Sequence, residues 1–108
     1  MLPKKERLDT KRFDEIIASG RNISAGAFYL KALNSDLLRF SVVIPKKVAK
    51  SAIKRHLLKR RVFNSIKENK ALFPVGDYIV FANKEMVDMN TLQINENIKN
   101  MAQKLASR

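Results

Sequence analysis

The chain has 108 residues, 45% of them hydrophobic, and 22 lysines and arginines against 10 acidic residues give it a formal net charge of +12. This length supports one core, so we predict a single domain over residues 1–108, with residues 1–7 flexible, and we expect a polyanion, first of all nucleic acid, to neutralise the charge. The absence of cysteine excludes disulfides and thiolate metal sites, and the lack of a long apolar stretch or signal-like segment predicts a cytoplasmic protein without membrane contact.

The N-terminal segment predicts a first helix over residues 10–19. Asp9 precedes it and can cap the free N–H groups of its first turn. Phe13 and Ile17 belong to its apolar stripe. Gly20 stands where a left-handed residue commonly ends a helix, so we predict that conformation there.

Three segments have the pattern of strands. Residues 27–33 and 39–44 alternate side chains with a period of two, and a short polar turn separates them. The short connection predicts an antiparallel hairpin between these two strands. Residues 77–82 are the most β-prone run in the chain, and their continuous apolar character predicts a central position in the sheet.

The densest basic segment, Pro45–Arg61, holds eight lysines and arginines and no acid. Its apolar residues recur at helical spacing, which would place one arc against a core: Val48, Ala52, Leu58, Val62 and Ile66. Ser51 can cap this helix, which we extend to about Asn69, and we expect Lys54 and Arg61 to project away from the arc. A solvated helix face normally mixes charges of both signs, so this segment favours a surface for nucleic-acid phosphates.

The C-terminal part predicts a loop over residues 86–90 and a final helix capped by Asn90 or Thr91. Its apolar residues recur at intervals of four, three and four: Ile94, Ile98, Met101 and Leu105. The predicted fold is therefore α+β, a small mixed sheet packed with three helices in the order α-β-β-α-β-α. The basic helix would form a βαβ crossover, and the general rule for such units is right-handed.

The residues that could support catalysis are scattered along the chain. A hydrolytic site needs a nucleophile with a base, a carboxylate pair or a metal cluster, and the sequence contains no such grouping. We interpret His56, the only histidine, as a phosphate-contacting or solvated residue rather than a general acid. We therefore predict no catalytic residue, metal site or cofactor on the protein itself.

The basic segment resembles the helix of the bacterial ribonuclease P protein subunit, whose hallmark is K-K-V-G-x-A-V-x-R-N-R-x-K-R. The matching residues are Lys46, Lys47, Val48, Ala52, Arg55, Lys59 and Arg60. His56 and Leu57 stand where the family has Asn and its second Arg, and one extra residue follows the K-K-V. The resemblance continues in the E-R-L opening at residues 6–8, the F-x-x-I-I-x-x-G spacing after it, and the D-Y-I-V-F-A-N-K segment from Asp77.

The resemblance implies a left-handed crossover and the function of a ribonuclease P protein subunit. In that ribonucleoprotein the RNA subunit performs the Mg²⁺-dependent hydrolysis that removes the 5′ leader of precursor tRNA, while the protein strengthens and broadens substrate binding. The RNA-subunit contacts that it implies are Lys46, Lys47, Lys50, Lys54, Arg55, His56, Lys59, Arg60 and Arg61. The leader contacts, in a cleft between the first helix and the sheet, are Phe13, Ile17, Tyr29, Lys31 and Arg39.

The expected partners are therefore the RNA subunit and precursor tRNA, with no obligate protein partner and with Mg²⁺ held by the RNA. The alternative is a structural RNA-binding protein of the ribosomal type, because domains of this size and charge are common there. A DNA-binding module is less favoured, because no helix-turn-helix pattern is present.

Overall fold

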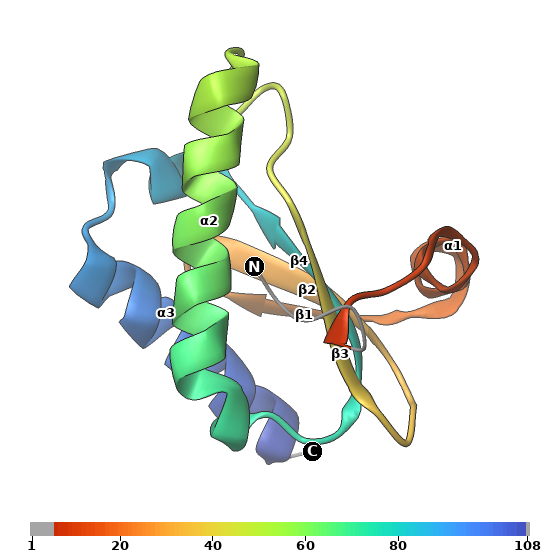
Figure 1. The fold of residues 1–108 in the computed structure, drawn as a ribbon. Coiled ribbons are helices and arrows are strands. Elements are labelled where there is room, and N and C mark those ends of the chain that lie inside the picture. The colour runs from red at the N-terminus through yellow and green to blue at the C-terminus, as the bar shows by residue number, and fades with distance from the viewer. Residues whose placement is uncertain (1–5, 108) are drawn as a thin grey trace.

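Three α-helices and four strands, with two short 3₁₀ helices, make up the computed structural model, which describes residues 6–107 (Figure 1). In chain order they are α1 (Thr10–Ser19), β1 (Arg21–Ala25), β2 (Phe28–Leu33), β3 (Leu38–Val43), α2 (Ala52–Asn69), η2 (Lys70–Leu72), β4 (Gly76–Ala82), η3 (Lys84–Asp88) and α3 (Thr91–Ala106). The α+β class is confirmed. The segment predicted as a loop before α3 contains η3 instead.

The four strands form one mixed sheet in the order β1-β2-β4-β3. β4 pairs antiparallel with β2 and parallel with β3, so its predicted central position is confirmed. The predicted hairpin between β2 and β3 is wrong, because β4 lies between them. A parallel β3–β4 pair requires a crossover, and α2 supplies it. Its left-handed sense stays an expectation of the family resemblance.

The strand β1 is absent from the sequence prediction. It pairs antiparallel with β2, and the two-residue turn between them begins at Gly26, whose φ is 59°. Glycine adopts this left-handed region without steric cost, which suits a tight hairpin. The signal was the alternation of Ile23 and Ala25, both buried, with polar neighbours.

The helices cover the two faces of the sheet unequally (Figure 1). α2 and α3 pack together over one face, and α1 lies alone on the other. The main core lies under α2 and α3 and takes in Phe28, Phe40 and the predicted apolar residues of α3. Ile16 of α1 and Ile79 of β4 are fully buried outside that main core. None of the helices between residues 6 and 107 has the length and apolar character needed to cross a membrane.

The predicted helix caps are confirmed at all three α-helices. Asp9, Ser51 and Asn90 each accept a hydrogen bond from the backbone N–H three residues further on, at 2.8, 3.3 and 2.8 Å. The side chain of Gln93 accepts a hydrogen bond in return from the backbone of Asn90, which completes a capping box. The start of each helix is therefore fixed by local side-chain chemistry.

The end of α1 differs from the prediction. Gly20 has φ −70° and ψ 151°, an extended conformation, so the predicted left-handed residue is wrong. A Cβ atom at this position would lie 2.5 Å from the carbonyl oxygen of Ile16. Glycine is needed here because the chain approaches the last turn of α1 too closely for a side chain.

The approach to α1 is tied to the rest of the domain. Residues 1–5, most of the segment predicted to be flexible, lie outside the described residues. Arg7 forms a parallel bridge with Phe40 of β3, and the carboxylate of Glu6 forms an ion pair with Lys70. These contacts connect the start of the described chain to the edge strand and to the end of α2.

Candidate nucleic-acid interface

The nine residues predicted to contact an RNA subunit lie along α2 and the loop before it, and we call them the basic strip. Six of them are exposed: Lys46, Lys47, Lys50, Lys54, His56 and Arg60. The other three are half-buried: Arg55, Lys59 and Arg61. The sequence contains no acid between Pro45 and Lys67. The strip therefore presents a surface of one sign, as phosphate binding requires.

The loop before α2 gives the strip its first part. Val48 and Ala49 are buried, and the carbonyl of Pro45 accepts a hydrogen bond from the N–H of Val48 at 2.9 Å. Because α2 begins only at Ala52, Val48 reaches the core from a turn rather than from the helix. Ala52 itself is exposed, so its predicted place in the apolar arc is wrong. The arc that faces the core starts at Leu58.

Two arginines of the strip also serve the fold. Arg55 donates from Nη1 to the carbonyls of Ala49 and Lys50, at 3.0 and 2.7 Å, and so fastens the loop to α2. Arg61 donates from Nη2 to the carbonyl of Met89 at 2.9 Å. Arg61, which was expected to project away from the apolar arc of α2, therefore also contacts the rest of the fold. A guanidinium has five N–H donors, so each of these arginines keeps donors for a phosphate.

Two hollows lie between the edge strand β3 and α2, and Lys59 lines both of them. The larger, of 330 Å³, is lined by Val42, Val43, Ile44, Ala52, Arg55, His56 and Lys59. The smaller, of 180 Å³, is lined by Arg7, Leu8, Phe40, Ser41, Lys59 and Phe63. Each hollow combines an apolar wall, which suits a base or ribose, with cationic groups, which suit a phosphate. The sequence offers no signal for them, because the packing of β3 beside α2 is tertiary.

The predicted leader contacts lie on the other face of the sheet. Tyr29 and Lys31 alternate along β2 with residues buried in the main core, so they point toward the α1 side. Tyr29 is 40% exposed, and its ring stacks on Phe81 of β4, with centroids 4.6 Å apart and an interplanar angle of 5°. Phe81 is not among the predicted leader contacts, although its alternation with Val80 and Ala82 along β4 indicates this face.

The remaining apolar contacts of this surface come from α1. Phe13 is half-buried and Ile17 is 41% exposed, on either side of the fully buried Ile16 in the sequence. α1 packs against β2 and β4. We call Phe13, Ile17, Tyr29, Lys31 and Phe81 the aromatic surface. It offers exposed apolar faces and one cation in place of a continuous row of charges.

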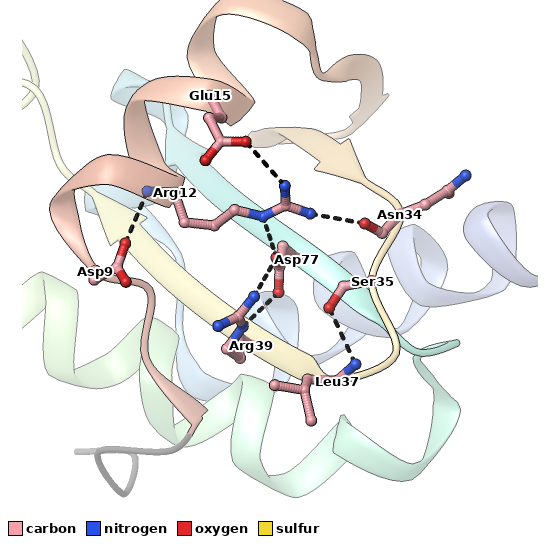
Figure 2. Close-up of polar contacts among 8 residues, drawn as sticks. All are labelled: Asp9, Arg12, Glu15, Asn34, Ser35, Leu37, Arg39 and Asp77. Atoms are coloured by element: carbon pink, nitrogen blue, oxygen red, sulfur yellow. Dashed lines mark hydrogen bonds and ion pairs between the residues drawn. The ribbon is translucent and has the colours of Figure 1, made fainter.

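A buried carboxylate holds α1 to the sheet, as Figure 2 shows. Asp77 of β4 is fully buried and is bound by two arginines, one from α1 and one from β3. Arg12 donates from Nε at 2.5 Å, and Arg39 donates from Nε and Nη2 at 2.8 and 2.7 Å. Arg12 also donates to the carbonyl of Asn34 and to Glu15. We call Arg12, Arg39 and Asp77 the charge cluster.

The charge cluster favours the charged forms of all three of its residues. Burial alone would raise the pKa of Asp77, but hydrogen bonds from Arg39 and Arg12 outweigh it, and the pKa lies below its ordinary value. The same hydrogen bonds raise the pKa of each arginine. Arg39 is one of the predicted leader contacts, and its guanidinium is bound by Asp77. The sequence signal for this cluster was Asp77, an acidic residue near the start of the otherwise apolar strand β4.

Among residues 6–107, no group of three or more histidine or acidic side chains is placed to hold a metal ion. The α+β domain has a cationic helix, whose one acid lies near its C-terminal end, on one side and exposed stacked rings on the other, and these features are typical of RNA-binding domains. The chain belongs to the Ribonuclease P family, because the model of that family, described as Ribonuclease P, matches residues 2–106.

Solved structures agree with this assignment. The structure of Staphylococcus aureus RNase P protein is 26% identical, covers 94% of this chain and 95% of its own, and has a TM-score of 0.80. The RNase P protein from Thermotoga maritima is 25% identical, covers 92% and 96% of the two chains, and also has a TM-score of 0.80. No curated protein matches the chain by sequence. Family and fold support a subunit of a ribonuclease P complex that associates with an RNA subunit.

Proposed function

We propose that this chain is the ribonuclease P protein subunit that binds the RNA subunit through the basic strip and the leader of precursor tRNA through the aromatic surface. The RNA subunit performs the hydrolysis that removes the leader. The observation that carries this proposal is the placement of two chemically different surfaces on opposite sides of one sheet, in a chain of this family. Opposite placement allows the two RNAs to be bound together.

The basic strip suits a structured RNA. Its exposed cations lie on α2, whose inner face packs on the core, and on the preceding loop, which Arg55 holds to α2, so their spacing is constant. Each phosphate that such a cation neutralises releases counterions, and this release drives binding. The hollows along β3 add apolar walls beside Arg55, His56 and Lys59, which suit a ribose or a base next to a bound phosphate.

The aromatic surface suits an unpaired strand. Unpaired bases stack on exposed rings, and such stacking tolerates different sequences because every base has a π face. Tyr29 is held flat against Phe81, so its outer face is preorganised for a base. Lys31, on the same face of β2, adds a cation for the backbone of the leader.

No residue of this chain is assigned a chemical step. Mg²⁺ would be held by the RNA subunit, where it supplies charge neutralisation at the reacting phosphate. The chain contributes affinity and position: it brings the leader to a fixed place relative to the RNA subunit, and fixed placement of a substrate lowers the entropic part of a barrier.

The test is reconstitution of the protein with the RNA subunit of the same genome. The affinity of the reconstituted complex is then measured for precursor tRNA and for mature tRNA. Tyr29→Leu removes the exposed ring and should weaken binding of precursor tRNA about tenfold, since stacking is worth roughly 1 to 3 kcal/mol per base. Binding of mature tRNA should stay unchanged, because it has no leader to stack. Lys31→Ala should also weaken binding of precursor tRNA and leave binding of mature tRNA unchanged. Its control is Lys99→Ala, because Lys99 is an exposed lysine of α3.

Equal weakening for precursor and mature tRNA would exclude the leader from the aromatic surface. Recovery of bulk ribosomal RNA with the tagged protein, in place of one RNA of a few hundred nucleotides, would favour the structural RNA-binding alternative. The melting temperature of each variant distinguishes a lost contact from a lost fold.

A further inference from the structure

α2 carries apolar side chains on two opposite faces. Leu58 and Val62 face the main core and are buried. On the outer face Ile53 and Leu57 are 77% and 55% exposed. They are four residues apart and therefore adjacent on the helix surface. We call Ile53 and Leu57 the apolar pair. Apolar residues scattered singly on a surface are ordinary, whereas this pair forms one continuous patch.

The apolar pair lies inside the basic strip. Lys54 and His56 fall between its two members along the helix, Lys50 precedes it and Arg60 follows it, and all four are exposed. The nearest acid in the helix is Glu68, near its C-terminal end. A ligand that covers the pair must therefore offer an apolar face and negative charge within a few ångströms of each other.

We propose that the apolar pair contacts the face of an unstacked base in the RNA subunit, while Lys54 and Arg60 bind the phosphates on either side. This inference rests on the proposed function, in which the basic strip binds that RNA. A nucleotide combines a charged phosphate with a flat apolar base, and bases in loops and bulges are free to be splayed onto a protein surface. Leu57 stands where the family motif has an arginine, so an apolar contact here replaces a phosphate contact.

A second copy of the chain is the other possible occupant, and charge argues against it. Two basic strips brought face to face would repel, because each chain has a net charge of +12 and neither strip contains an acid. Stable protein interfaces bury about 800 Å² per partner, and two aliphatic side chains supply a small part of that area. RNA satisfies the charge and the apolar pair together.

The test measures the affinity of the whole protein for its RNA subunit over a salt series at constant Mg²⁺. Ile53→Ala and Leu57→Ala should each weaken binding about fivefold, and the double variant should weaken it about 25-fold. Effects of this size are expected because each substitution removes part of the aliphatic surface that the bound RNA buries. The slope of log affinity against log salt should stay unchanged, because no phosphate contact is lost. Leu92→Ala is the matched control: like Ile53, Leu92 is the second residue of its helix, and it is 67% exposed.

Chemical probing of the RNA bases supplies a second readout. At least one unpaired base protected by the wild-type protein should become reactive with the double variant and stay protected with Leu92→Ala. The inference is overturned if the double variant binds as Leu92→Ala does, if its loss of affinity comes with a flatter salt slope, or if the free wild-type protein dimerises through the pair. If the wild-type protein does not bind the RNA subunit, the proposed function fails first; if it binds and these substitutions change nothing, only this inference fails.

Discussion

Arginine has opposite surroundings on the two sides of this molecule. In the charge cluster, Arg12 and Arg39 converge on Asp77, and their side chains are only 21% and 22% exposed. In the basic strip, cations follow one another on α2 and its preceding loop with no acid among them, and most are exposed. The cluster satisfies its charges within the protein, whereas the strip leaves its charges for another molecule.

The difference shows how a net charge of +12 is distributed between folding and binding. A buried charge must be paired, because an unpaired one costs several kcal/mol of desolvation. Exposed charges of one sign repel each other only weakly in water, so the fold tolerates them. The charge cluster therefore fixes the position of α1, on which part of the aromatic surface depends, and the basic strip provides the electrostatic attraction to RNA.

Removal of the acid of the charge cluster should have the greatest effect on stability. Asp77→Asn leaves two arginines without their counterion, and breaking such a buried pair should lower the free energy of unfolding by about 3 to 5 kcal/mol. Urea unfolding measures this change. Asp36→Asn, at an exposed position, is the control and should stay within about 0.5 kcal/mol of the wild type. A loss for Asp77→Asn as small as that of the control would mean that the cluster does not hold α1.

The contribution of the charge cluster to stability should depend on pH, because Asp77 titrates. The pKa of Asp77 is lower in the folded chain than its ordinary value of 3.8, so the unfolded chain takes up this proton at higher pH. The stability contributed by this carboxylate is complete above the unfolded pKa and is lost as pH falls through the folded pKa. From about pH 5 downward, the difference in unfolding free energy between wild type and Asp77→Asn should therefore shrink. A difference that is constant with pH would contradict this.

The smallest expected effects compare two cations of the basic strip. Lys54→Ala should leave stability unchanged and flatten the slope of log affinity for the RNA subunit against log salt by up to about 0.9, the value for one phosphate contact in B-form DNA. Arg61→Ala should in addition destabilise the fold by about 1 kcal/mol, because it removes the hydrogen bond to the carbonyl of Met89. Denaturant unfolding and a salt titration together distinguish the two. Equal stability of the two variants would mean that the bond to Met89 contributes nothing.

Features that depend on residues close together in the chain could be predicted from the sequence. The caps at Asp9, Ser51 and Asn90 were predicted because a capping side chain acts on a backbone N–H three residues away. The helices beginning at these caps, the central position of β4 and the α+β class followed from periodicity and apolar runs. The basic strip was visible because charge is a property of composition.

Contacts between distant segments were not readable in the same way. A short loop between β2 and β3 predicted a hairpin, and only the long-range pairing of β4 overrides it. The ion pairs of Asp77 join residues 65 and 38 positions apart, so no local pattern indicates them. The internal bond of Arg61 was missed for the same reason, since its partner lies beyond β4 in the sequence.

The insertion of β4 also bears on how the domain comes together. β2 and β3 are synthesised before β4, but in the sheet they are joined only by pairing with β4, which lies more than thirty residues after β3. A chain that stops before Gly76 would contain three of the four strands and could form only the β1–β2 pair of the native sheet. Assembly of the sheet is therefore cooperative: the last strand in the sequence joins its two halves, and no stable half-domain is expected along the way.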